Sequence, residues 1–157
     1  MGWRTWRELR SSELADVPCK PGAYVVFRPS KAHPRFIHPS PAGWFKAQDP
    51  SVSIERLKDE WVPGAHVVYI GKAAFRRRRK LIEALRERLG EFARFGAGEA
   101  IGHKGGRLIW QLADSDELLV AWQEVTWGED ARGYEKRLLC RFGALHGGRR
   151  PFANLTG

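Results

Sequence analysis

The chain has 157 residues, which is enough for one domain with a single sizeable hydrophobic core. Its hydrophobic fraction of 43%, with seven tryptophans and eight phenylalanines, is typical of a folded globular protein, and no stretch approaches twenty apolar residues. The net charge of +9 favours a phosphate polymer as partner, and nucleic acid over a membrane surface.

The two cysteines, Cys19 and Cys140, form no CxxC pair, so the sequence indicates neither a zinc cluster nor a disulfide framework. This pattern favours a reducing compartment. The first residues include no apolar core of signal-peptide length, so we expect a cytoplasmic location.

Residues 1–20 are expected to form a helical extension that packs on the main domain, which we place at 21–157. Trp3, Trp6, Leu9 and Leu14 recur in this segment at near-helical spacing. Pro21 and Gly22 end it, and the β-forming residues of 23–27 predict the first strand.

The stretch 29–50 contains five prolines and is predicted to be a long loop. Ser53 is the expected N-cap of a short helix that reaches residue 61. The apolar run at 66–71 then predicts the second strand, which ends in a tyrosine, a glycine and a lysine.

A strongly basic helix is predicted from residue 76 to about residue 95, because leucines and a phenylalanine recur there at spacings of four, four and three. Its first residues are expected to meet phosphate nonspecifically, as part of a solvated face. They are Arg76, Arg77, Arg78, Arg79 and Lys80. Arg88 differs, because its place beside the apolar stripe favours a fixed, bidentate grip on a phosphate.

His103 lies in a glycine-rich basic loop with Lys104 and Arg107, both of which we expect to contact nucleic acid. For the histidine, a structural and a catalytic role are equally favoured. Residues 108–112 follow as a helix or a strand, and 118–125 as the third strand.

The last predicted helix runs from a capping box of Thr126 and Glu129 to about Phe142. Glu135 should lie at the edge of its buried face. On spacing alone, a surface carboxylate paired with Lys136 or Arg132 is favoured over a functional group.

In this order the motifs resemble the GIY-YIG nuclease superfamily over about residues 20–157. Each motif is weak alone, but six of them in the family's order are specific. They are Gly22-Ala23-Tyr24, Tyr69-Ile70-Gly71, Lys72-Ala73, Leu85-Arg86-Glu87-Arg88-Leu89, Glu135 and Pro151-Phe152-Ala153-Asn154.

The resemblance implies an α+β sandwich, in which helices flank a small three-stranded antiparallel sheet. It also implies a metal-dependent endonuclease that hydrolyses DNA, with Glu135 binding Mg²⁺, or Mn²⁺ in its place. Gly22 and Gly71 would have structural roles in the two tyrosine motifs. Tyr24 would act as general base or water-orienting residue, and Arg88 would stabilise the phosphate. The other catalytic residues would be Tyr69, Lys72, His103 and Asn154.

Three departures from the family pattern bear on the site. About forty residues separate the tyrosine motifs instead of one hairpin, so 29–64 is interpreted as an insertion. The arginine follows the second motif at a longer distance than usual, and Arg86 remains the alternative to Arg88. Phe92 stands where the family often has a tyrosine or histidine, and His103 is the candidate replacement.

Two other classes of function remain open from the sequence. The chain could be a non-catalytic basic nucleic-acid-binding module on the same fold, or a structural protein of an RNA particle. Intact Tyr24, Tyr69, Arg88 and Glu135 favour the enzyme. The sequence leaves three points open: whether the DNA is duplex or branched, what the oligomeric state is, and whether a protein partner supplies specificity.

Overall fold

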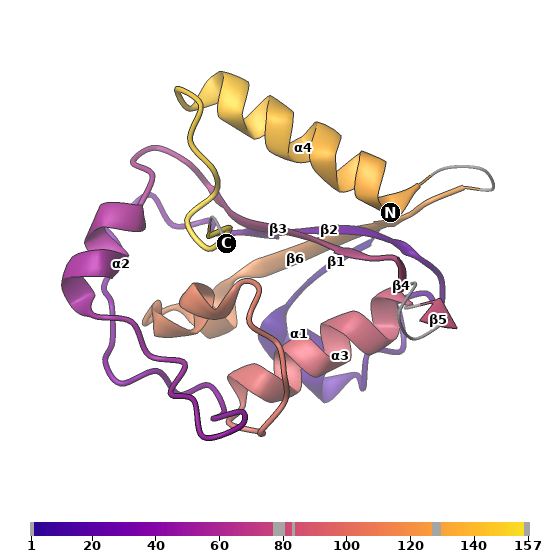
Figure 1. Cartoon of the computed structure of the whole chain (residues 1–157), viewed down its shortest axis with the longest axis horizontal. Helices are drawn as coiled ribbons and strands as arrows, with labels where there is room; N and C mark the ends of the chain where they lie inside the picture. The colour runs from indigo at the N-terminus through magenta and orange to yellow at the C-terminus, as the bar shows by residue number, and fades with distance from the viewer. Residues whose placement is uncertain (1, 77–80, 83, 127–129, 156–157) are drawn as a thin grey trace.

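The computed structural model describes residues 2–76, 81–82, 84–126 and 130–155. It is an α+β fold built on one antiparallel sheet with the strand order β1-β6-β2-β3 (Figure 1). The four strands are β1 (Gly2–Thr5), β2 (Gly22–Phe27), β3 (Val67–Ala73) and β6 (Leu119–Glu124). Helix α4 lies on one face of this sheet, and α1 and α3 lie on the other.

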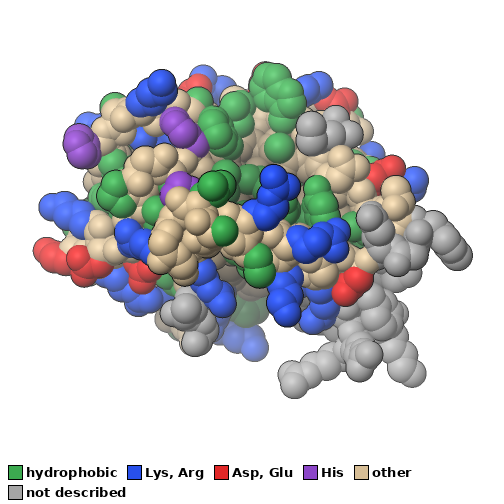
Figure 2. Space-filling view, turned by 90° about the horizontal axis from the view of Figure 1, so that it is seen from above, with side chains coloured by type: hydrophobic (Ala, Val, Ile, Leu, Met, Phe, Trp, Pro, Cys, Tyr) green, Lys and Arg blue, Asp and Glu red, His purple; other side chains and the backbone are tan. Residues whose placement is uncertain are grey.

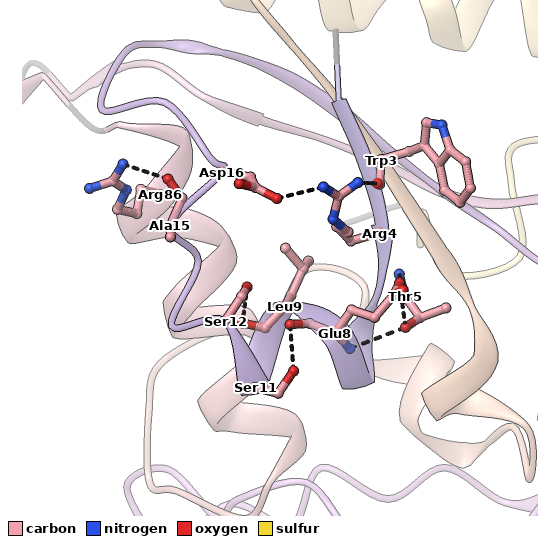
Figure 3. Close-up of polar contacts among 10 residues, drawn as sticks. All are labelled: Trp3, Arg4, Thr5, Glu8, Leu9, Ser11, Ser12, Ala15, Asp16 and Arg86. Atoms are coloured by element: carbon pink, nitrogen blue, oxygen red, sulfur yellow. Dashed lines mark hydrogen bonds and ion pairs between the residues drawn. The ribbon is translucent and has the colours of Figure 1, made fainter.

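The sheet has four strands and not the three expected, because residues 2–5 pair with β6. The helical prediction for residues 1–20 is right only for α1 (Trp6–Ser11). Thr5 and Glu8 form a capping box that begins this helix, as Figure 3 shows. Trp6 and Leu9 are fully buried.

The register between β2 and β3 divides the motif residues between the two faces of the sheet. Tyr24 pairs with Gly71, and Val26 pairs with Tyr69. Because side chains alternate along a strand, Tyr24 and Tyr69 share one face, and both belong to the core that α1 and α3 cover. Lys72 pairs with Ala23 and lies on the opposite face, toward α4.

The insertion at 29–64 packs on the domain as a long loop followed by α2 (Ile54–Glu60). Ser53 caps this helix, as predicted. The buried Gln111 holds the loop, because its amide bonds the backbone of Ile37 and Val52 at 2.8–2.9 Å. Gln111 itself ends a 3₁₀ helix, Arg107–Gln111, so residues 108–111 are helical, whereas Leu112 is extended and forms an isolated β-bridge with Phe36.

The predicted helix from residue 76 begins much later than expected. A two-stranded ribbon of β4 (Phe75–Arg76) and β5 (Leu81–Ile82) occupies its first part, and α3 runs over Leu85–Gly96. The amides of Leu85 and Arg86 instead bond the carbonyls of Lys20 and Pro18, which fixes where α3 starts.

Helix α4 (Ala131–Leu145) begins at Asp130, whose side chain accepts from the amide of Arg132 at 3.0 Å. The N-cap is therefore not Thr126, and Glu129 lies outside the described residues. Phe142 is buried, and Leu138 and Leu139 pack beside it against the sheet. A second short 3₁₀ helix covers Ser115–Glu117. No helix within the described ranges is long and apolar enough to cross a membrane.

Candidate functional site

The two motif tyrosines meet in the interior below the sheet. Their ring centroids are 5.9 Å apart, with Tyr24 only 1% and Tyr69 only 6% exposed. Phe92 of α3 contacts both rings, at 6.4 and 5.5 Å. Residues that are 45 positions apart in the sequence are thus held together by the β2–β3 pairing and one helix.

The glycines of the motifs make room for this arrangement. A Cβ at Gly71 would lie 2.4 Å from Cζ of Tyr24, because the phenol lies across β3 at this residue. A Cβ at Gly22 would lie 2.3 Å from the carbonyl oxygen of Gln123 and 2.7 Å from Leu85. Both glycines therefore permit close approach, which any larger residue would prevent.

Arg88 comes to the tyrosines from α3, with a side chain that is only 15% exposed. Its positive charge acts on both phenols and opposes the rise of their pKa values. One guanidinium nitrogen also lies 3.5 Å from Glu91. The guanidinium is therefore held beside the phenols, as its place next to the apolar stripe predicts.

Arg86 has a different environment. Its Nε donates to the carbonyl of Val17 at 2.8 Å, and a second nitrogen donates to that of Ala15 at 3.2 Å. Figure 3 shows this contact with Ala15 and the nearby ion pair of Arg4 with Asp16. Arg86 thus anchors the N-terminal segment, and Arg88 is the arginine that lies with the tyrosines.

Burial governs the acidity of the two phenols. It raises the pKa of Tyr24 well above its ordinary value, Tyr69 raises it further, and Arg88 opposes the rise. Burial likewise raises the pKa of Tyr69, with Arg88 opposing the shift and the charge of Glu135 adding to it. Because their pKa values are raised above that of a free phenol, both Tyr24 and Tyr69 are neutral at physiological pH.

Glu135 and Lys72 form an ion pair of 2.5 Å between α4 and β3, on the face opposite the phenols. The glutamate side chain is 17% exposed, so it lies at the edge of the buried face as predicted. Its partner is Lys72, and not Lys136 or Arg132. The carboxylate is still close enough to Tyr69 to raise the pKa of that phenol.

His103 is buried and stacks on Phe92, with ring centroids 4.3 Å apart and planes inclined by 11°. Phe92 therefore touches the histidine and both tyrosines. Gly105 and Gly106, which follow Lys104, cover Tyr69: a Cβ at Gly105 would lie 2.7 Å from its hydroxyl. Sequence reasoning assigned no role to this glycine pair, although two adjacent glycines in a basic loop were a visible signal.

Asn154 does not point at the tyrosines but binds the outer edge of β3. Its Oδ1 accepts from the Ile70 amide and its Nδ2 donates to the Ile70 carbonyl, both at 2.8 Å. The amide of Ala153 also donates to the carbonyl of Val68 at 2.8 Å. Asn154 is therefore a positioning residue, which holds the strand that carries Tyr69.

The predicted basic contacts are only partly described. Arg76 lies in β4, whereas Arg77, Arg78, Arg79 and Lys80 lie outside the described residues. Lys104 is exposed, and burial together with the charge of Arg56 lowers the pKa of Arg107.

A second basic surface, which sequence reasoning missed, lies on α4. Figure 2 views the molecule from the side of α4 and shows lysine and arginine side chains in its middle, with acidic ones nearer the rim. The signal was a repeated spacing of four. The exposed cations of this α4 surface are Arg132, Lys136, Arg137 and Arg141.

At this site the protein can offer a metal ion only a few ligands. No group of three or more histidine, cysteine or acidic side chains is assembled within the part of the chain that the structure describes. Glu135 offers a single partly buried carboxylate. Mg²⁺ usually keeps several waters and binds through one or two carboxylates plus substrate phosphate, so a lone glutamate fits it.

Against family models, curated proteins and solved structures, the chain has no significant match. Its function is therefore inferred from the residues and their geometry alone.

Proposed function

We propose that the protein is a metal-dependent endonuclease of the GIY-YIG type, which hydrolyses phosphodiester bonds in DNA. The observation that supports this most is the meeting of Tyr24, Tyr69 and Arg88 from β2, β3 and α3. A fold that only bound DNA would not need two phenols and a guanidinium together in its interior. The negative charge of Glu135, which lies on the other face of the sheet, also acts on Tyr69 and raises its pKa.

The charge that develops on a phosphate during hydrolysis needs a fixed cation, and Arg88 is held in place to supply it. Tyr24 acts as a neutral group that orients water or phosphate through its hydroxyl, since burial disfavours the phenolate that a general base would require. Tyr69 lies between Tyr24 and the charge of Glu135, and it positions the same water or phosphate. His103 stacks on Phe92, which contacts both phenols, and so helps to hold the phenols in place.

Glu135 is the residue that would hold the divalent cation, Mg²⁺ or Mn²⁺. When bound, this ion supplies positive charge at the phosphate oxygens. Lys72 pairs with the same carboxylate at 2.5 Å and so fixes the orientation of the glutamate side chain.

The decisive experiment compares cleavage by the wild-type protein with that by Glu135→Ala and Arg88→Ala. Duplex, branched and single-stranded DNA are incubated with Mg²⁺ or Mn²⁺, and products are resolved on denaturing gels. We expect cleavage by the wild type and loss of at least about a hundredfold in either variant, the scale of one electrostatic catalytic group. Arg94→Ala is the matched control, because Arg94 is an exposed arginine on the same helix.

Wild-type protein that leaves every substrate intact with both metals would overturn the enzyme assignment. The second candidate, a non-catalytic DNA-binding module on the same fold, is favoured by two features: Tyr24 is 1% exposed, and the carboxylate of Glu135 is already paired. This candidate predicts binding of the same DNA with no product, and no effect of Glu135→Ala on affinity.

A further inference from the structure

A pocket of about 130 Å³ lies between the insertion and the loop that carries His103. Its walls come from both segments: Phe45, Gln48 and Asp49 on the insertion side, and Phe95 and His103 on the other. It is smaller than the 300–1,000 Å³ typical of sites that enclose a whole small-molecule ligand. The space therefore suits one planar ring system whose substituents remain outside.

The walls combine flat apolar surface with hydrogen-bonding groups. Phe45 and the largely buried Phe95 contribute aromatic rings to the lining, and Gln48, Asp49 and His103 line the same space. The carboxylate of Asp49 is fixed, because Oδ1 accepts from the amide of Ser51 at 2.8 Å. A fixed carboxylate disfavours a bare anion in the pocket, but it accepts well from the amino and imino groups of a nucleobase.

Cationic side chains surround the mouth of the pocket. Lys46 lies over the ring of Phe45 at 5.5 Å, Lys104 is exposed, and Arg107 lines the opening. The Arg107 guanidinium is partly buried and lies near the positive charge of Arg56, and both effects lower its pKa. A phosphate attached to a base inside the pocket would relieve this repulsion.

The turn that presents this mouth is strained. Lys46 and Ala47 both have positive φ angles, 51° and 57°, in a tight turn where the amide of Gln48 donates to the carbonyl of Phe45 at 3.0 Å. Residues other than glycine rarely adopt this conformation, which costs about 1–2 kcal/mol for each one. Strain of this kind is typical of binding loops, and here it sets Phe45 and Lys46 at the opening.

We propose that this pocket binds one unstacked nucleobase of DNA, so that the preferred substrates carry an unpaired nucleotide, as bulges, flaps and junctions do. The inference rests on the proposed DNA partner and names its substrate class. Stacking against Phe45 and Phe95 supplies affinity, and Lys46, Lys104 and Arg107 take the flanking phosphates. The pocket also adjoins the tyrosines, because His103 stacks on Phe92.

The test measures binding in EDTA, so it does not depend on cleavage. Fluorescence anisotropy compares three labelled duplexes: fully paired, with one unpaired adenine, and with an abasic residue in place of that adenine. We expect the unpaired adenine to bind about tenfold more tightly than the abasic duplex, which corresponds to about 1.4 kcal/mol of base stacking. Equal affinity for these two duplexes would overturn the proposal.

Phe45→Ala should reduce that tenfold ratio to near one, while Leu145→Ala, which removes an exposed apolar side chain on α4, should preserve it. Gln48→Ala is the second pocket variant. It alters an exposed residue and leaves the core intact, and it should lower the ratio severalfold. A ratio unchanged in both pocket variants excludes the pocket. Loss of cleavage with an intact ratio would instead contradict only the nuclease assignment.

Discussion

The hydroxyl of Tyr24 lies in the interior, where burial outweighs the nearby positive charge of Arg88. Because the pKa is raised and not lowered, this phenol differs from the general base that the family resemblance suggests. It can donate a hydrogen bond at neutral pH, which is sufficient to orient a water molecule. If the protein hydrolyses DNA as proposed, another group or hydroxide from solvent would take the proton from the attacking water.

This burial predicts a pH dependence of stability. The unfolded chain loses its tyrosine protons near pH 10, whereas the raised pKa values of Tyr24 and Tyr69 keep them bound in the folded state. The contribution is fully present below pH 10. Above it, the free energy of unfolding should fall by up to about 1.4 kcal/mol per pH unit for each tyrosine. Urea unfolding between pH 8 and 11 measures this slope, and Tyr24→Phe should make it shallower. An unchanged slope in that variant would contradict the assignment of a raised pKa.

Gly71 permits the phenol of Tyr24 to cross β3, so Gly71→Ala should be strongly destabilising. The added Cβ would lie 2.4 Å from Cζ and 2.6 Å from the hydroxyl oxygen of Tyr24. Overpacking of this kind costs about 1–3 kcal/mol, which chemical denaturation would detect. Gly133→Ala is the control, because its Cβ would meet no side chain closer than 3.8 Å and a helix favours alanine.

The double variant Gly71→Ala with Tyr24→Ala separates this contact from a general effect on β3. If the clash with the phenol causes the loss, Gly71→Ala should cost much less when Tyr24 is already alanine. Additive losses in the double variant would show that the two residues act independently.

At the level of elements, the C-terminal segment completes the sheet along the outer edge of β3. Asn154→Ala removes both hydrogen bonds to Ile70 and should lower the free energy of unfolding by about 1–3 kcal/mol, since each contributes about 0.5–1.5. Hydrogen exchange of the Ile70 amide should accelerate. Asn154→Asp is the matched control, because it keeps the acceptor for that amide and should protect it better than alanine does.

Lys72 and Glu135 join β3 to α4, and the same pair affects metal binding if Glu135 holds the cation. Lys72→Met removes a positive charge that competes for the carboxylate. We expect Mn²⁺ to bind several times more tightly, as titration calorimetry would measure. Lys20→Met is the control, because Lys20 pairs with Glu124 at the surface and lies outside the proposed site. Weaker Mn²⁺ binding in Lys72→Met would show that the lysine supports the metal site.

For the whole molecule, the net charge of +9 predicts DNA affinity that falls steeply with salt. The α4 surface should supply part of this dependence. Alanine at Arg132, Lys136 or Arg141 should each lower the slope of log K against log salt concentration by about 0.9, the value for one phosphate contact. Arg7→Ala, on α1 at the opposite face, should leave the slope unchanged.

Local patterns predict much of this fold. The strands that carry Tyr24 and Tyr69, the cap at Ser53 and the proline-rich loop agree with the structure, since alternation, capping and proline act over a few residues. Arg88 also lies beside the apolar stripe as expected, and the choice of Arg88 over Arg86 as the catalytic arginine stays a prediction.

Other features depend on contacts between distant residues. The strand at residues 2–5 forms only because β6 offers an edge far along the chain, where Thr5 pairs with Leu119, 114 positions later. Lys72 likewise reaches Glu135 across 63 positions. The raised pKa of Tyr24 follows from complete burial, which no local pattern specifies. Neither the pocket at Phe45 nor the edge contact of Asn154 could be read from spacing.

The edge contact of Asn154 has a consequence for synthesis on the ribosome. The backbone of Ile70 bonds to Asn154, which is synthesised 84 positions later. At about 5–20 residues per second, the outer edge of β3 therefore stays open for several seconds. During that interval β3, which begins with the apolar residues Val-Val-Tyr-Ile, offers free backbone groups to any other nascent chain. Substitutions at Asn154 should therefore lower soluble yield during rapid expression more than their effect on equilibrium stability implies.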